Sequence, residues 1–306
     1  HGGVYNSAPI VNYADESLKE ELLPAVAAGE ASIQAFGLTE PNSGSESTAM
    51  ETFAERDGDE YVVNGQKIWT SRVDHSDYLL LMARTTPLAD VEKHTRGISM
   101  FLVDLEDAMA QGALEMEQIP KSVSNAVHAF ELWFDDLRVP AAHLIGEEGR
   151  GFYQVLDGLN EERLVIAGEC IGLGEAALER GVDYAANREV FSRPIGKNQA
   201  IQHPLADAYM HLQAAKQLAY ESAEKVDDEE GKATGTLANT SKYLAAEACY
   251  QAADAAVQTH GGFGVAREYD VERYFREARL TRLVPITQEL VLNYVAENEL
   301  RLPRSY

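Results

Sequence analysis

Basic residues are scarce in this sequence of 306 residues. Its 26 lysines and arginines stand against 50 aspartates and glutamates, which gives a formal net charge of −24. Such a surface repels the phosphate groups of nucleic acids and of anionic membranes, so neither is expected as a partner. Dissolved cations would screen the repulsion among the acidic groups. The charge therefore predicts a halophilic source, with an acidic cytosolic protein of ordinary habitat as the alternative.

Cysteines and long apolar runs are equally rare. Cys170 and Cys249 are the only cysteines, which argues against a disulfide framework and fits a reducing compartment. No apolar run approaches the roughly 20 residues of a membrane-spanning helix. The chain also does not open with a basic region followed by an apolar stretch. We therefore expect a cytoplasmic protein that does not enter a membrane.

The motifs of several enzyme classes are missing as well. The eight histidines show neither an HExxH pattern nor another close metal-ligand spacing, so no metal site is predicted. The sequence also contains no GxSxG elbow, no Walker loop and no GxGxxG after a strand. These absences argue against a zinc hydrolase, an α/β-hydrolase, a P-loop NTPase and a Rossmann dehydrogenase.

The first half of the chain reads as a short start followed by a strand-rich segment. Residues 1–9 contain Gly and Ser and are expected to be irregular, and a helix with a break at Pro24 is expected from Asp15 onward. The dipeptides at 57–58 and 64–65, Asp-Gly and Asn-Gly, predict hairpin turns. The expected strands are residues 48–56, 61–63, 66–70, 78–83, 97–103 and 130–134.

The second half has the apolar spacing of helices. Ala-rich segments with helical period cover residues 152–187, 199–226, 236–259 and 268–299. Four long helices with short connections favour an antiparallel bundle. The predicted fold is therefore mainly α, with a central antiparallel β domain and a C-terminal four-helix bundle. The expected domains are a helical remnant at 1–34, the β domain at 35–147 and the bundle at 148–306.

Two segments of the β domain have the composition of a cofactor site. Residues 36–45, FGLTEPNSGS, end an apolar strand in a polar turn whose proline fixes φ and whose amides and hydroxyls can bind a polar molecule. Residues 67–71, KIWTS, place one of two tryptophans beside two hydroxyls, which can cover an aromatic face and hydrogen-bond its edge. Each segment alone is also compatible with a hairpin end around a packed aromatic.

Together these segments resemble the flavin-binding signature of the acyl-CoA dehydrogenase family. Residues 187–207 and 258–264 are similar to further family segments, and the resemblance runs from about residue 15 to the C-terminus. Members normally carry more helices before that point, so the chain resembles an N-terminally shortened member. The resemblance implies FAD as cofactor. The implied contacts in the β domain are Phe36, Leu38, Thr39, Ser45, Trp69, Thr70 and Ser71, and those near the C-terminus are Thr287 and Glu289. The residues implied to contact the cofactor of a partner subunit are Arg188, Gln199, Gln258, Gly261 and Gly262.

The position of the catalytic base is the unusual feature. Most members carry a glutamate in the segment that matches residues 282–289, where this chain has Pro285. Proline can neither accept a proton nor donate a backbone N–H to a thioester oxygen. Isovaleryl-CoA and long-chain acyl-CoA dehydrogenases carry the base on the first helix of the C-terminal domain, before an arginine. That match makes Glu162 the expected base, with Glu161 as the next candidate and Arg163 as a substrate-binding residue.

The resemblance implies FAD-dependent α,β-dehydrogenation of an acyl-CoA thioester. Asn160 and Ser45 are implied as further substrate contacts, electron-transfer flavoprotein as the electron acceptor, and a homotetramer, a dimer of dimers, with shared FAD sites. Two alternatives remain open. An acyl-CoA oxidase would carry out the same half-reaction with oxygen as acceptor, and a flavin- and CoA-binding relative would have lost dehydrogenation because of Pro285.

Overall fold

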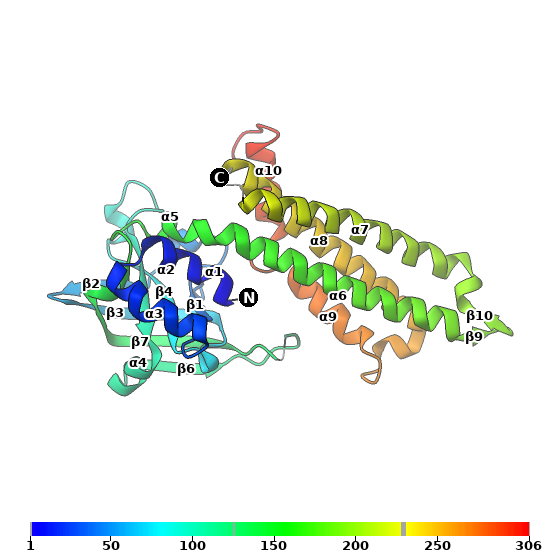
Figure 1. Cartoon of the computed structure of the whole chain (residues 1–306), viewed down its shortest axis with the longest axis horizontal. Helices are drawn as coiled ribbons and strands as arrows, with labels where there is room; N and C mark the ends of the chain where they lie inside the picture. Colours follow the sequence, from blue (N-terminus) through cyan, green and yellow to red (C-terminus); the bar gives the residue numbers. More distant parts are fainter. Residues whose placement is uncertain (1, 125, 228–230, 306) are drawn as a thin grey trace. The chain divides into compact units, whose positions relative to one another are not determined.

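The chain forms two compact units, His1–Leu159 and Asn160–Tyr306. A computed structural model describes residues 2–124, 126–227 and 231–305, and Figure 1 colours them along the chain. Within these ranges no helix combines the length and the apolar character that a membrane span needs. Each unit has its own hydrophobic core.

Three helices open the first unit: α1 (Gly2–Tyr5), α2 (Ser7–Tyr13) and α3 (Glu16–Ala28). The expectation of irregular structure at 1–9 is wrong for the described residues, because Pro9 and Ile10 pack into the core as part of a helix. The predicted break at Pro24 is also wrong. Pro24 lies on the exposed side of α3, and the apolar face that contains Leu18 and Leu22 keeps the helix docked around it.

The rest of the first unit is a largely antiparallel sheet, as predicted. The strand order is β6-β7-β3-β2-β4-β5-β8, and β1 pairs with β4. The strands are β1 (Ala35–Gly37), β2 (Phe53–Asp57), β3 (Glu60–Ser71), β4 (Tyr78–Arg84), β5 (Ile98–Asp104), β6 (Leu114–Gln118), β7 (Ala129–Pro140) and β8 (Leu144–Ile145). The helices α4 (Leu105–Gln111) and α5 (Gly151–Val155) complete the unit.

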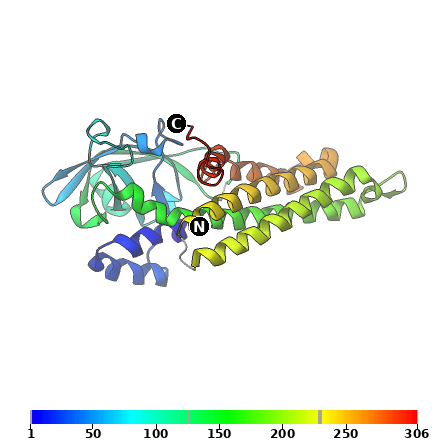
Figure 2. The same cartoon turned by 90° about the horizontal axis from the view of Figure 1, so that it is seen from above.

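The sheet is buried on both faces in its centre. In β4, Leu79 and Leu81 face one core, which includes residues of α4, whereas Leu80 and Met82 face another, which includes residues of α2 and α3. Figures 1 and 2 show these N-terminal helices lying over one face of the sheet. A strand with two buried faces reads as a continuous apolar run, which is why residues 78–83 were recognisable from sequence.

The two predicted hairpin turns have different outcomes. Asp57 and Glu60 pair across the β2–β3 hairpin, so the turn at Asp57-Gly58 is confirmed. The turn at Asn64-Gly65 is wrong, because both residues lie inside β3, where its register with β7 shifts. Gly65 has φ +147°, and a Cβ there would lie 2.6 Å from the Cα atom of Thr52. This glycine permits a close backbone approach between strands rather than a reversal.

A buried ion pair connects the polar turn after β1 to β3. The Nζ atom of Lys67 lies 2.7 Å from Oε1 of Glu40, and their side chains are 0% and 7% exposed. Glu40 also accepts hydrogen bonds from the backbone N–H groups of Glu51 and Thr52. Burial lowers the pKa of Lys67 to about 8, while Glu40 opposes that shift. Burial raises the pKa of Glu40, but Lys67 and the hydrogen bonds leave it below its ordinary value.

The second unit is a helical bundle, as predicted. Its helices are α6 (Leu159–Asn187), α7 (Gln199–Asp227), α8 (Gly231–His260), α9 (Val271–Thr281) and α10 (Gln288–Asn298), with the small hairpin β9 (Glu189–Val190) and β10 (Arg193–Pro194) between α6 and α7. In Figures 1 and 2 the three long helices run side by side. Their core is rich in alanine, which lets the helices pack closely.

The fourth expected helix, residues 268–299, is wrong as a single element. It is divided into α9 and α10, and Pro285 lies in the connection. Proline offers no N–H to a helix and disfavours helical geometry in the residue before it. Thr287 then begins α10 as its N-cap, because its hydroxyl accepts a hydrogen bond from Leu290 N at 3.4 Å.

Replacing Lys67 by methionine is expected to lower the free energy of unfolding by about 3–5 kcal/mol at pH 7, because Glu40 would keep a buried charge without its partner. Urea denaturation measures this change. Lys93→Met removes an exposed lysine from the same unit and serves as the control. A Lys67→Met protein as stable as the control would contradict the dependence of Glu40 on Lys67.

Candidate functional site

The two predicted cofactor segments of the β unit lie side by side. Ile68 N donates a hydrogen bond to the carbonyl oxygen of Thr39 at 2.9 Å. The ammonium group of Lys67 donates to the carbonyl oxygen of Leu38 at 3.1 Å. These bonds join residues 36–45 to residues 67–71, so the polar turn and the tryptophan-containing end of β3 form one local site.

The side chains at this site suit an aromatic, polar ligand. Trp69 has φ +64° and is 54% exposed, which leaves much of its indole ring uncovered. Beside it, Thr70 is buried, and its Oγ1 atom has no hydrogen-bond partner among the described residues. A buried hydroxyl without a partner costs free energy unless a ligand supplies one. The exposed ring and the unpartnered hydroxyl therefore fit a flavin.

The remaining predicted residues of this site surround that pair. Ser71 is half-buried, and Ser45 is exposed in the polar turn. Phe36 is half-buried and meets the ring of Tyr5 edge-on at 6.1 Å between centroids. Seven predicted residues of the β unit thus come from two neighbouring segments: Phe36, Leu38, Thr39, Ser45, Trp69, Thr70 and Ser71.

The helical unit places the expected base at the start of α6. Burial raises the pKa of Glu162 to about 7, and the adjacent Arg163 opposes this increase. Arg163 donates a hydrogen bond from Nη1 to Oδ1 of Asn160 at 2.9 Å. The three predicted residues of this group therefore form one cluster. Glu161 lies in the same turn, and its Oε2 atom is buried without a hydrogen-bond partner among the described residues.

The connection between α9 and α10 is held close to this cluster by Lys242. This lysine of α8 is fully buried and donates a hydrogen bond to the carbonyl oxygen of Ile286 at 2.8 Å. Burial lowers its pKa to about 8, and both Arg163 and Glu289 contribute to its electrostatic environment. The segment around Pro285 and the α6 cluster therefore belong to one polar region of the helical unit.

The α9–α10 connection has further anchors of its own. Glu247 of α8 lies 2.7 Å from Arg282, and the side chain of Gln288 donates a hydrogen bond to the same carboxylate. Thr287 is committed to capping α10, whereas Glu289 is exposed. These contacts fix the backbone on both sides of Pro285.

A second group of predicted residues lies at the other end of α6. The rings of Tyr184 and His260 stack with centroids 4.1 Å apart, which joins the C-terminal ends of α6 and α8. Arg188 follows α6, and the glycines predicted from the Gly-Gly segment follow α8. At about 1.5 Å per residue, roughly 39 Å of helix separate Glu162 from Arg188. The exposed members of this group are Arg188, Gln199, Gln258, Gly261 and Gly262.

Two supporting residues, Glu40 and Lys67, were not among the predicted site residues. The signal for Lys67 was present in the sequence, since it continues the inward-facing side of β3 beyond Tyr61 and Val63. A lysine at an inward position of a strand requires a buried acid. The sequence gave little indication that Lys242 is buried, because a lysine in an Ala-rich helix is ordinarily exposed.

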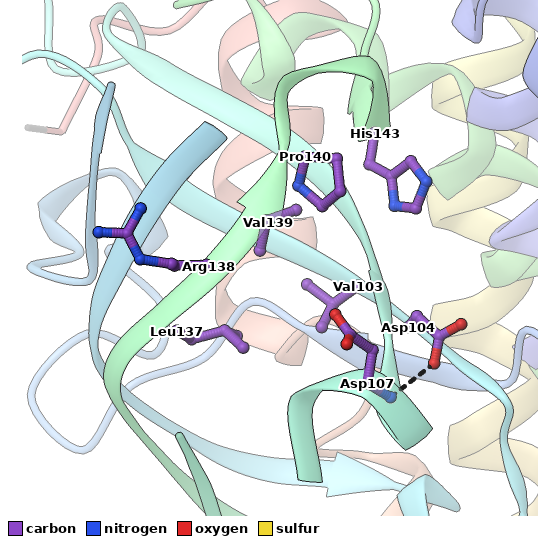
Figure 3. A pocket seen from close by; sticks show the side chains of 8 residues that line it. All are labelled: Val103, Asp104, Asp107, Leu137, Arg138, Val139, Pro140 and His143. Carbon is purple, nitrogen blue, oxygen red and sulfur yellow. Dashed lines mark hydrogen bonds between the residues drawn. The ribbon is translucent and has the colours of Figure 1, made fainter. Parts of the chain in front are cut away.

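Two cavities are lined by other described residues than these. One of about 210 Å³ in the β unit is lined by β5, α4, β7 and the turn with His143 (Figure 3). Its polar groups already have local roles: Asp104 caps α4 at Asp107, Arg138 pairs with Asp57, and His143 bonds to a backbone carbonyl. A second cavity of about 590 Å³, with almost entirely apolar walls, lies between α6 and α7.

Known families match both units. The acyl-CoA dehydrogenase middle domain matches residues 35–137, and the acyl-CoA dehydrogenase C-terminal domain matches residues 149–300. The acyl-CoA dehydrogenase fadE12 of Mycobacterium tuberculosis is 36% identical over 302 residues, which cover 98% of this chain and 76% of the relative.

Solved structures agree with the sequence comparison. The glutaryl-coenzyme A dehydrogenase glutaryl-CoA complex has a TM-score of 0.90 and 30% identity, covering 99% of this chain and 75% of that one. A structure described as the electron transferring flavoprotein of Acidaminococcus fermentans has a TM-score of 0.89 and 30% identity, covering 98% and 76%. The chain therefore belongs to the acyl-CoA dehydrogenase family of FAD-dependent oxidoreductases.

Proposed function

We propose that this protein removes one hydrogen each from the α- and β-carbons of an acyl-CoA thioester and yields the trans-2-enoyl-CoA. The observation that carries the proposal is the raised pKa of Glu162 beside Arg163, in a chain whose usual base position holds Pro285. A carboxylate with a pKa near the working pH is an effective general base. Its placement on α6 supports a branched or longer acyl group as substrate.

Residues of the β unit would hold the flavin ring. The indole of Trp69 would cover one face of the ring, and the hydroxyl of Thr70 would gain the partner that it lacks. When bound, FAD supplies the acceptor for the hydride that leaves the β-carbon. The buried pair of Lys67 and Glu40 would keep the polar turn in place for this contact.

Glu162 would take the proton from the α-carbon of the thioester. Its neighbour Arg163 limits the rise of its pKa, so that a substantial ionised fraction remains at neutral pH. Asn160 orients Arg163 through their hydrogen bond, and both residues would contact the CoA portion of the substrate. Ser45 would contact the substrate near its thioester. Pro285 would contribute neither a base nor an N–H group to that oxygen.

Electron-transfer flavoprotein is the proposed acceptor of the electrons, supported by the chain's membership of the acyl-CoA dehydrogenase family and by a matching chain in a structure described as an electron transferring flavoprotein. Oxygen as acceptor would make the protein an acyl-CoA oxidase, which a hydrogen peroxide assay distinguishes. Loss of dehydrogenation is the remaining alternative, motivated by Pro285. The strongly acidic surface supports a salt-rich cytoplasm as the setting of the reaction.

A homotetramer built as a dimer of dimers would explain the two separated groups on α6. Roughly 39 Å of rigid helix lie between Glu162 and Arg188, so Arg188 would serve the cofactor of a partner subunit. Arginine suits that role because its planar guanidinium can bind two phosphate oxygens. At the same end, Val182, Tyr209 and Met210 are more than half exposed and line the apolar cavity between α6 and α7. A second copy of the chain that packs here would remove these apolar side chains from water.

Replacing Glu162 by glutamine is expected to slow the reduction of bound FAD by acyl-CoA by about 10²–10⁴-fold, because the general base is removed. Anaerobic titration with straight and branched acyl-CoAs in high-salt buffer, followed by flavin absorbance, measures this. Glu161→Gln is the matched control and is expected to keep the activity. Loss of activity in the control instead would assign the base to Glu161, and a parent protein that no acyl-CoA bleaches would favour the binding-protein alternative.

The contribution of Glu162 to the stability of the parent protein is expected to fall as the pH rises from about 4.5 to about 7. In this range Glu162 stays protonated in the folded chain, whose pKa is about 7, but ionises in the unfolded chain, whose pKa is near 4.5. The unfolded state then binds fewer protons, so a rise in pH favours unfolding. Above pH 7, Glu162→Gln should exceed the parent in free energy of unfolding by up to about 3 kcal/mol.

Denaturation at several pH values between 4 and 8 gives the comparison for Glu162. Below about pH 4.5 the advantage of Glu162→Gln over the parent should vanish, because the carboxyl group of Glu162 is then largely protonated in both the folded and the unfolded chain. Glu179→Gln removes an exposed carboxylate from the same helix and is the control. A difference between Glu162→Gln and the parent that does not change with pH would contradict the raised pKa.

Replacing Met210 by glutamate is expected to shift the protein from a tetramer to smaller species, because a charge would be buried in the proposed subunit contact. Light scattering coupled to size-exclusion chromatography measures the mass. Gln217→Glu adds the same charge at an exposed position of α7 outside the apolar cavity. A parent protein that elutes as a monomer, or a Met210→Glu protein of unchanged mass, would refute this contact.

A further inference from the structure

Three potential metal ligands meet on the β unit just beyond the flavin-binding segment that ends at Ser71. Neither a sequence motif nor the family resemblance pointed to them. Asp74 and His75 lie in the 3₁₀ turn Val73–His75 that follows β3, and His128 immediately precedes β7. The pairing of Ser71 with Ala129 and the hydrogen bond from Arg72 N to His128 O, 2.9 Å long, bring these two chain segments together.

The three side chains converge on one point. The Nδ1 atom of His128 lies 2.6 Å from Oδ2 of Asp74, and Nε2 of His75 lies 3.7 Å from the same oxygen. One ligand atom from each residue lies within 4.8 Å of the other two. The imidazole rings are stacked at an interplanar angle of 28°, with centroids 6.3 Å apart. Two imidazole nitrogens and a carboxylate oxygen thus form a triangle open on one side.

We propose that Asp74, His75 and His128 bind a zinc ion. Tetrahedral zinc with bonds of about 2.0–2.1 Å to nitrogen and oxygen separates its ligand atoms by roughly 3.3 Å, which lies between the separations seen here. Zinc would replace the hydrogen that His128 Nδ1 shares with the carboxylate. Because the side chains of His75 and His128 are 61% and 39% exposed, water can reach the fourth ligand position.

The local backbone holds the ligands ready for the ion. Val73 is buried in the core and anchors the 3₁₀ turn. Ser32 donates a hydrogen bond to the carbonyl oxygen of His75, and His75 N donates to Arg72 O. Preorganised ligands lose less conformational entropy on binding a metal. His75 is the most exposed ligand, so its side chain is free to move its Nε2 atom, now 3.7 Å from Oδ2 of Asp74, to the separation that zinc requires.

Neighbouring charges affect the affinity but leave the ligand set intact. Arg72 precedes the turn, and the amine of Lys121 donates to the carbonyl oxygen of Val127, next to His128. These cations oppose a bound metal ion, whereas the carboxylate of Asp74 and the overall charge of −24 favour it. Nitrogen ligands favour zinc over calcium or magnesium, which prefer sets of oxygen ligands. The ion would hold the turn after β3 against the start of β7, beside the segment that ends at Ser71.

Equilibrium dialysis of the chelator-treated, FAD-loaded full chain against zinc chloride tests the site, with protein that carries no added histidines. The parent is expected to retain about one zinc ion per chain, and calcium chloride is expected to leave none bound. His75→Ala and His128→Ala should weaken zinc binding at least about tenfold. His94→Ala removes an exposed histidine of the same unit and should bind zinc as the parent does.

Thermal melting supplies a second measurement on the same proteins. Zinc is expected to raise the melting temperature of the parent and of His94→Ala, but not that of His75→Ala, whose exposed side chain is not needed for folding. The proposal is overturned if the parent retains no zinc. It is also overturned if His75→Ala binds as much zinc as the parent and shows the same zinc-induced rise in melting temperature.

Discussion

The buried pair of Lys67 and Glu40 is the interaction on which the cofactor region depends. Glu40 accepts hydrogen bonds from the ammonium group of Lys67 in β3 and from the backbone N–H groups of Glu51 and Thr52, just before β2. Lys67 also reaches the carbonyl oxygen of Leu38. A single pair of charges therefore fixes the turn against the strand that ends in Trp69. Because both charges are withdrawn from water, neither residue can be lost without leaving the other uncompensated.

In the helical unit a buried lysine likewise holds the backbone in place, here next to Pro285. Pro285 prevents a continuous helix and provides no N–H, so the backbone on either side needs other partners. Lys242 binds the carbonyl oxygen of Ile286, and Thr287 caps α10. The same buried region raises the pKa of Glu162. Glu162 of α6 can therefore supply the base although Pro285, in the connection between α9 and α10, occupies the position where most family members carry it.

Short-range patterns predicted much of the fold. Continuous apolar runs marked the buried strands, Ala-rich helical spacing marked the bundle, and Asp57-Gly58 marked a true hairpin. The errors came where distant contacts decide local structure. Asn64-Gly65 has the composition of a turn, but the close approach of Thr52 makes it part of a bulged strand. Pro24 has the character of a helix breaker, but the packed face of α3 outweighs the missing hydrogen bond.

The sequence by itself determined the family resemblance, the division into a strand-rich first half and a helical second half, and the candidate residues, because motifs and apolar periods are local properties of the chain. Tertiary structure alone decided which of these residues are neighbours. It joined Leu38 to Lys67, separated Glu162 from Arg188 by the length of α6, and brought His75 to His128 through the pairing of β3 with β7. Burial and distance between remote segments arise only when the chain is packed, and pKa shifts and ligand geometry follow from them.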